Sequence, residues 1–347
     1  MAVSAAVSSP KLFVGAAPTR NPTAPSVSSS GHWRADLRIG LFTDGLAHLS
    51  LDEVIAWSAE RGIHDLELGV GGYSTSPHLE LDTLLASAAA RRALVAAIET
   101  GGCRISALNA SGNPLHPDPV YARRHEAELR GAVALAARLG VERVVAMSGC
   151  PGSGTRPVFA GGAWLPDMEG LWREQWERIS RFWGDLSIWA EREAPGVSML
   201  LELHPGTSIY NAASFEALRS VVGENVGVNL DPSHFWWQGI DPLQAVDALA
   251  GHIGFAHGKD TLLRAELISR NGVLDFAWPE RPSEELPWHF CAVGAGHDVG
   301  EWRRLLTAIA RAGHDGVVSI EHEDPRLSPE KGIDASLRAL LEASVGL

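Results

Sequence analysis

From residue 37 onward, short apolar runs alternate along the chain with longer amphipathic stretches. The apolar runs are continuous rather than alternately apolar and polar, which is typical of parallel strands buried on both faces. They predict strands at residues 37–43, 65–70, 104–109, 143–147, 197–202, 226–231, 253–257 and 316–321.

The amphipathic stretches carry helix start and stop signals. Ser50 with Glu53 three residues later is a capping box, and Gly62 is a typical residue after a helix end. Similar signals predict helices at about 121–139, from Asp241-Pro242, at about 298–312 and from Ser328-Pro329. Eight strands alternating with helices predict a single (β/α)8 barrel over residues 37–347, with a doubly wound open sheet as the alternative. No G-x-G-x-x-G follows the first strand, which weakens that alternative.

Two connections are long, at residues 148–170 and 258–297. Both follow strands, so we expect them at the carboxyl-terminal mouth, where barrel enzymes place their sites. Trp164, Trp278 and Trp288 lie in them and suggest a roomy aromatic pocket. Residues 1–36 are rich in Ser, Ala, Pro and Val and lack a basic region followed by an apolar one. We interpret them as a disordered extension, with a targeting role as the alternative.

Charge and cysteine content narrow the function class. The chain of 347 residues has a formal net charge of −13 and no Lys/Arg cluster, which argues against nucleic acid or an anionic membrane as partner. No apolar run reaches the roughly 18 residues of a membrane span. Three scattered cysteines without CxxC spacing indicate reduced thiols, so we predict a cytoplasmic location. No segment marks an interface, which leaves a homo-oligomer and a complex with a second subunit open.

Four metal-ligating side chains each end an apolar run: Glu202, Asp231, His257 and Glu321. In a barrel, strand ends converge on one mouth, so these side chains should point at a common centre. Three carboxylates and an imidazole suit Mn²⁺ best, with Mg²⁺, Co²⁺ and Zn²⁺ as alternatives. A lone Glu at a strand end is usually solvated or ion-paired, but four on neighbouring strands are harder to explain in that way.

Motifs around these residues are Leu201-Glu-Leu-His-Pro205, Asn229-Leu-Asp-Pro-Ser-His234, Ala256-His-Gly-Lys-Asp260 and Ser319-Ile-Glu-His-Glu323. Over about residues 38–345 the chain resembles the sugar isomerase/epimerase superfamily with a xylose-isomerase-like barrel. The resemblance implies that Glu202 and Glu321 serve both as metal ligands and as the two acid/base groups, with Asp231 and His257 completing the metal site. It also implies that His234 contacts the substrate, a small carbohydrate.

Further candidates surround this set. His204 is a candidate catalytic residue, and it departs from the pattern of the simplest sugar epimerases, as do Lys259 and Asp260. The predicted substrate-binding residues beside His234 are Asn109, His116, Trp236, Lys259 and Asp260. For Asn109, His116 and Trp236, loop capping or core packing is an equally good interpretation, as it is for Glu67, which could also meet a sugar. The turn Gly294-Ala-Gly-His297 is a weak candidate phosphate cradle.

The leading functional hypothesis is a metal-dependent isomerase or epimerase that moves a proton next to a carbonyl group. A lyase or deglycosidase that eliminates a substituent from a 3-oxo sugar or glycoside would use the same groups. A metal-free barrel acting as a binding subunit is a third, non-enzymatic hypothesis. A nuclease is disfavoured by the acidic charge.

Overall fold

A computed structural model describes residues 37–152, 169–275, 281–314 and 316–346. The predicted extension at 1–36 lies outside these ranges, as do Trp164 and Trp278. Within the described ranges, no helix has both the length and the apolar character that crossing a bilayer requires.

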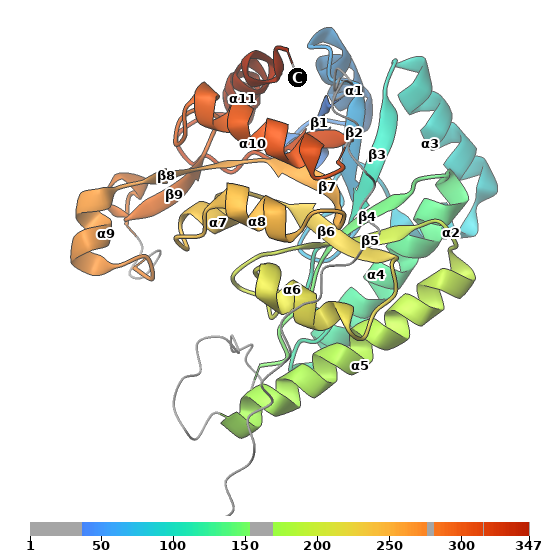
Figure 1. Cartoon of the computed structure of the whole chain (residues 1–347). Helices are drawn as coiled ribbons and strands as arrows, with labels where there is room; N and C mark the ends of the chain where they lie inside the picture. The colour runs from blue at the N-terminus through green and yellow to red at the C-terminus, as the bar shows by residue number, and fades with distance from the viewer. Residues whose placement is uncertain (1–36, 153–168, 276–280, 315, 347) are drawn as a thin grey trace, which may run out of the picture. The chain divides into compact units, whose positions relative to one another are not determined.

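The described chain forms a closed barrel of eight parallel strands (Figure 1). They are β1 (Arg38–Phe42), β2 (Asp65–Gly69), β3 (Arg104–Asn109), β4 (Arg143–Met147), β5 (Ser198–Glu202), β6 (Val226–Leu230), β7 (Ile253–Gly258) and β10 (Val317–Ile320). The barrel closes where β1 pairs with β10, with Gly40 opposite Ser319. The predicted barrel is therefore confirmed over the open sheet, and each strand lies within about two residues of its expected bounds.

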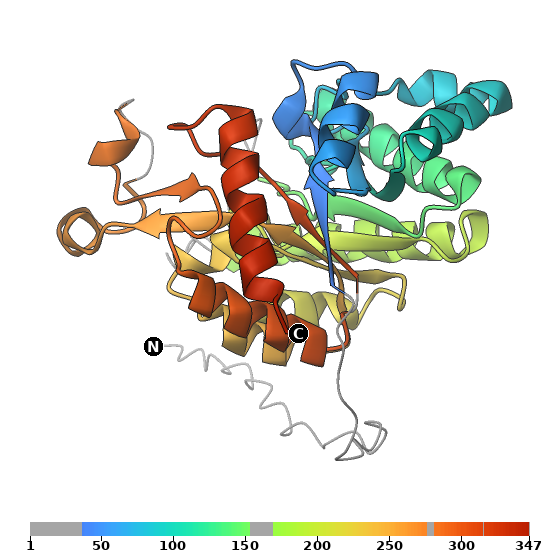
Figure 2. The same ribbon diagram turned by 90° about the horizontal axis from the view of Figure 1, so that it is seen from above.

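Helices fill the connections between the strands: α1 (Leu51–Glu60), α2 (Leu81–Ala86), α3 (Ala88–Thr100), α4 (Pro119–Leu139), α5 (Glu169–Glu193), α6 (Ala212–Arg219), α7 (Ser233–Trp236), α8 (Pro242–Ala248), α10 (Val299–Arg311) and α11 (Pro329–Ser344). The predicted capping box of Ser50 and Glu53 starts α1, and α4 ends at Gly140, which adopts φ 71°. In Figure 2, α10 and α11 lie together against one side of the strands.

The apolar core has two parts. A large cluster of buried side chains lies between strands and helices, as the continuous apolar runs require. A smaller cluster comes from five strands: Ala107, Val145, Leu200, Phe255 and Val317. Alternate residues of a strand share a face, so Leu200 and Glu202 point the same way, as do Phe255 and His257. The barrel interior thus has an apolar floor directly beneath the polar strand ends.

The long connection after β7 has structure of its own, which the sequence did not predict. It contains β8 (Asp260–Leu263), α9 (Ala265–Asn271), the short helix η4 (Ser283–Glu285) and β9 (Trp288–Cys291). The strands β8 and β9 pair antiparallel, with Asp260 opposite Cys291. This arm projects from the barrel in Figure 1. Pairing satisfies the backbone groups of a connection too long to remain irregular.

Gly40 offers a test of barrel closure. A Cβ at this position would lie 2.5 Å from Val317 Cγ1 and 2.9 Å from the carbonyl oxygen of Asp65. We expect Gly40→Ala to destabilise the protein by about 1–3 kcal/mol, because the Val317 side chain must repack and the Asp65 carbonyl cannot move without shifting a strand. Gly170→Ala is the control, since nothing lies within 4 Å of its Cβ. Denaturant unfolding of both variants measures the difference, and equal stability would contradict this packing account.

Candidate metal centre

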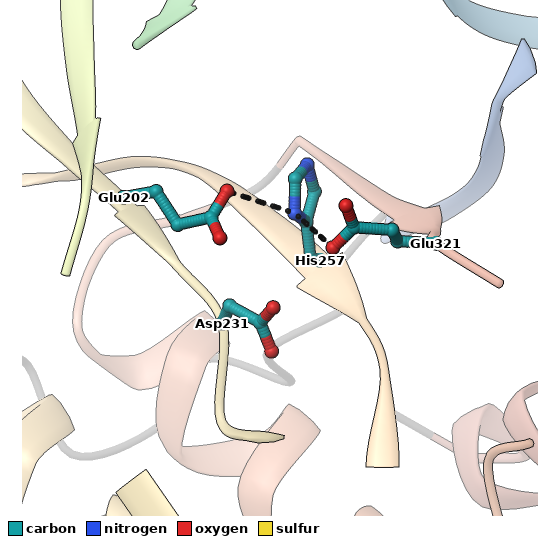
Figure 3. A group of neighbouring side chains, drawn as sticks. All are labelled: Glu202, Asp231, His257 and Glu321. Atoms are coloured by element: carbon teal, nitrogen blue, oxygen red, sulfur yellow. Dashed lines mark ion pairs between the residues drawn. The ribbon is translucent and has the colours of Figure 1, made fainter. Parts of the chain in front are cut away.

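The structure brings together the four side chains predicted as ligands. One ligand atom each of Glu202, Asp231, His257 and Glu321 lies within 4.8 Å of all the others (Figure 3). Glu202 ends β5, His257 lies in β7, and Asp231 and Glu321 directly follow β6 and β10. The first three are buried, and Glu321 is 14% exposed. Parallel strand ends at the barrel mouth produce this convergence.

The donor set fits a divalent cation. Ligand atoms about 2.0–2.2 Å from one ion lie at most about 4.4 Å apart. A spacing within 4.8 Å therefore requires shifts of only a few tenths of an ångström. Three carboxylates so close together, two of them buried, also need counter-charge, because like charges in a low-dielectric site repel strongly.

A second carboxylate contacts His257 on the side of the ring away from the centre. Its Nε2 lies 3.1 Å from Glu67 Oε2, while its Nδ1 lies 3.1 Å from Glu321 Oε2 on the side of the centre. Asn109 in turn donates from Nδ2 to Glu67 Oε1 at 2.8 Å. Burial lowers the pKa of His257, but the charges of Glu67 and Glu321 outweigh it and raise that pKa well above its usual value. Such a carboxylate partner fixes which ring nitrogen faces a metal.

Lys259 supplies counter-charge beside the centre. Its Nζ is buried 2.6 Å from Glu321 Oε2, 3.0 Å from Asp231 Oδ2 and 3.3 Å from Glu323 Oε2. Burial raises the pKa of Glu321, but Lys259 and His257 together lower it to about 2. Glu321 is therefore ionised at neutral pH. Lys259 was predicted to bind substrate; its observed contacts are with these carboxylates.

Two further histidines adjoin the ligands. His234 Nε2 lies 2.8 Å from Glu202 Oε1 and 3.2 Å from Asp231 Oδ2. Burial lowers the pKa of His234, but Asp231 and Glu202 together outweigh burial and raise that pKa to about 9. The ring of His204 lies edge-on to that of His234, with centroids 4.3 Å apart. Burial, and then His234, lower the pKa of His204 well below its usual value, so its ring is neutral.

A cavity of about 340 Å³ opens beside the centre, at the lower end of the range usual for small-molecule sites. Glu202 and Glu321 line it, as does Asn109, a predicted substrate-binding residue. Two more acids, Asp44 and Glu323, also line it. Its size suits a ligand as small as a monosaccharide.

Of the six predicted substrate-binding residues, Asn109 alone is among the described lining residues of this cavity. His234 and Lys259 contact the ligand carboxylates, and the other three make contacts elsewhere. Asp260 is buried and accepts from the backbone N–H groups of Gly294, Gly296 and His297 at 3.0–3.2 Å. Trp236 stacks on His297, with ring centroids 3.8 Å apart. His116 Nδ1 accepts from the backbone of Asp118 at the start of α4. These contacts are structural, and they give no support to a role in substrate binding.

The contacts of Asp260 also correct the suggestion of a phosphate cradle at Gly294–His297. The N–H groups of this turn surround a carboxylate of the protein itself, which takes the place that an anionic ligand would need.

The sequence did not identify Asp44 as a residue of the site, and it did not predict that Glu67 contacts His257. Asp44 follows β1 just as the predicted ligands follow their strands, so the same strand-end rule identifies it. Glu67 was considered for sugar contact or packing, but its side chain is fully buried and contacts His257. No sequence signal distinguishes a carboxylate that faces a cavity from one that supports a neighbouring ligand.

The comparisons with known proteins agree on the fold. The family model described as "Xylose isomerase-like TIM barrel" matches residues 55–343. The uncharacterized protein YfiH of Bacillus subtilis (strain 168) is 35% identical over 311 residues, which cover 88% of this chain and 98% of that protein.

Solved structures with a similar fold differ in what they do. The probable 3-DHS dehydratase AsbF of Bacillus anthracis has a TM-score of 0.62 at 15% identity, covering 88% of this chain and 99% of that one. The IolI protein with a bound zinc atom has 0.60 at 19%, covering 89% and 98%. An L-ribulose 3-epimerase has 0.55 at 18%, covering 90% and 94%. At these identities the structures establish the fold alone.

The position of Asp44 predicts a pH-dependent gain in stability on its replacement. Burial raises the pKa of this carboxyl from 3.8 to about 6, with Ser74 opposing and Glu67 and Glu321 adding to the rise. The folded state therefore binds the proton more tightly than the unfolded state. The resulting destabilisation is full above about pH 6 and fades as the pH falls toward 4. We expect Asp44→Asn to raise the melting temperature at pH 7.5 and much less at pH 4.5.

Thermal unfolding in EDTA measures this effect, and the exposed Asp52, replaced by Asn, is the charge-matched control. An equal shift at both pH values, or an equal shift in the control, would contradict the assignment to Asp44.

Proposed function

The chain belongs to the xylose isomerase-like TIM barrel family, and on that premise we propose that it is a divalent-metal-dependent isomerase or epimerase of a keto sugar or related polyol. One observation carries the proposal: two carboxylates on the cavity wall, Glu202 and Glu321, converge with Asp231 and His257 within 4.8 Å. Such a site offers both a cation position and proton-transfer groups next to a space for a small molecule.

The proposed ion is Mn²⁺, held by Glu202, Asp231, His257 and Glu321, with Mg²⁺, Co²⁺ and Zn²⁺ as alternatives. The zinc-containing IolI structure supports a divalent ion in a barrel of this fold. The chemistry that such an ion supplies is polarisation of a carbonyl group, which acidifies the adjacent C–H bond.

The two glutamates move the proton in the proposed reaction. Lys259 and His257 keep Glu321 ionised, and an ionised carboxylate is required to accept a proton. Glu202 receives a hydrogen bond from His234 at Oε1. One carboxylate oxygen takes the proton from the carbon next to the carbonyl, and the other carboxyl returns a proton. Return to the same carbon inverts it. Return to the former carbonyl carbon isomerises the sugar, with the proton of the neighbouring hydroxyl passing to the former carbonyl oxygen.

Elimination is the second candidate, because a β-leaving group departs from the same enediolate. The dehydratase AsbF supports it as a reaction of this fold. The predicted aromatic pocket does not support elimination, because these tryptophans pack on other side chains of the protein. Trp288 stacks on Trp237, with ring centroids 4.4 Å apart, and Trp236 stacks on His297. Mass spectrometry of products separates the two candidates, since isomerisation conserves substrate mass and elimination releases water or an aglycone. A metal-free binding subunit is the third alternative.

Asp231→Ala tests the metal and the activity together. We expect this variant to bind no stoichiometric Mn²⁺ and to lose at least about a thousandfold in activity, because it lacks a ligand. Metal analysis after gel filtration and turnover of a ketose panel measure both quantities. Asp247→Ala, at an exposed position on α8, is the control. Full activity of Asp231→Ala without bound metal would rule out this centre.

Glu202→Gln separates proton transfer from metal binding. The amide oxygen remains a weak ligand but accepts no proton, so we expect partial Mn²⁺ binding with loss of about 10²–10⁴ in rate. Incorporation of deuterium from D₂O into the substrate, followed by NMR, reports the proton step for either product. Exchange at the wild-type rate in this variant would exclude Glu202 as the acid/base group.

Glu67→Gln tests whether the carboxylate of Glu67 orients the ring of His257. The amide cannot replace the charge that holds Nε2–H, so we expect Mn²⁺ affinity to fall about 10–100-fold while the fold is kept. Calorimetric titration with Mn²⁺ measures the change. Unaltered affinity would show that Glu67 does not orient this ligand.

A further inference from the structure

Asp44 stands on the cavity wall outside the metal-ligand set. It lies in η1 (Thr43–Leu46), the 3₁₀ turn that directly follows β1. The hydroxyl of Ser74, another residue of the cavity wall, lies beside its carboxyl. Its Oδ1 is buried and has no hydrogen-bond partner among the described residues. Because Oδ1 is enclosed by the protein, a cavity ligand reaches this carboxyl at the part that lines the cavity wall, where a donor group can add a hydrogen bond.

Gly69 makes room for this arrangement. A Cβ at Gly69 would overlap both Asp44 Oδ1 and Ser74 Oγ. The end of β2 therefore has no side chain at the point where the carboxyl and the hydroxyl meet.

The charges of the cavity indicate which ligand Asp44 takes. Four acidic residues line it, Asp44, Glu202, Glu321 and Glu323, and no Lys or Arg is among its described lining residues. The nearby Lys259 is already paired with Asp231, Glu321 and Glu323. A phosphate or carboxylate near Asp44 would be repelled by these carboxylates and would find no cationic side chain among the described lining residues, whereas a hydroxyl group can donate to Asp44.

We propose that Asp44 is a specificity-determining residue that accepts a hydrogen bond from a substrate hydroxyl and restricts the site to uncharged polyhydroxylated carbonyl compounds. The inference deepens the proposed function and rests on it, because the proposed reaction defines which group of the substrate lies at the metal centre. The raised pKa of Asp44, about 6, is consistent with an ionised acceptor at neutral pH. A site built to pair a hydroxyl discriminates strongly against ligands that lack it, because the buried acceptor is then left unpaired.

The test uses the Mn²⁺-loaded full chain as wild type, Asp44→Ala, Asp44→Asn and the control Asp52→Asn. Free ketohexoses, their monodeoxy analogues and their 1- and 6-phosphates are compared by turnover and by calorimetric binding. We expect wild type and control to bind and convert the free sugar and to reject both phosphates by at least about a hundredfold. We expect Asp44→Ala to raise KM at least about tenfold with kcat changed less than about threefold.

The deoxy analogues separate a binding role from a structural one. In wild type, one analogue should bind at least about tenfold more weakly than its parent sugar. In Asp44→Ala, the same analogue and its parent should bind equally, which a purely structural role of Asp44 would not produce. Asp44→Asn should relax the rejection of phosphates.

The outcomes distinguish the two proposals. Unchanged KM in Asp44→Ala, or a wild-type preference for a phosphate, would overturn the role of Asp44 while turnover leaves the proposed reaction standing. Binding of free sugar that depends on Asp44, without any turnover, would support this inference and overturn the proposed reaction. Absence of sugar binding by wild type would overturn both.

Discussion

Mutual repulsion among buried carboxylates is the constraint on which the rest of the site depends. Glu202, Asp231 and Glu321 gather with His257 within 4.8 Å, and Glu67 and Glu323 lie just beyond them. Lys259 and His234 neutralise part of this charge, which leaves a strong field for a divalent cation. In the proposed function, the same side chains hold the cation and transfer the proton, because a ligand carboxylate has oxygen atoms for both tasks.

The barrel makes this concentration of charge tolerable. Leu200 and Phe255 form an apolar floor two residues before Glu202 and His257, so the strands are held by packing rather than by their polar ends. Closure of β1 on β10 leaves no sheet edge among the eight strands, and this rigid frame fixes the directions of the strand-end side chains. The packing residues and the polar residues of the centre are thereby separated along each strand.

Much of this organisation follows from the sequence because it depends on periodicity and on strand ends. The eight apolar runs predict the barrel, and the position of Glu202, Asp231, His257 and Glu321 at strand ends predicts that they meet. The immediate environment of a side chain does not follow in this way. Asp260 and Trp236 are close to predicted ligands in sequence, yet local turns direct them to Gly294–His297. The β8–β9 arm was missed because its pairing spans about 30 residues without a short turn signal.

A crystal structure of the protein grown with Mn²⁺, with anomalous scattering recorded at the manganese edge, tests the central claim most directly. The account predicts one strong anomalous peak within about 2.0–2.4 Å of an oxygen of each of Glu202, Asp231 and Glu321 and of Nδ1 of His257. A map with no peak between these four residues, or with manganese bound elsewhere on the barrel, would contradict it.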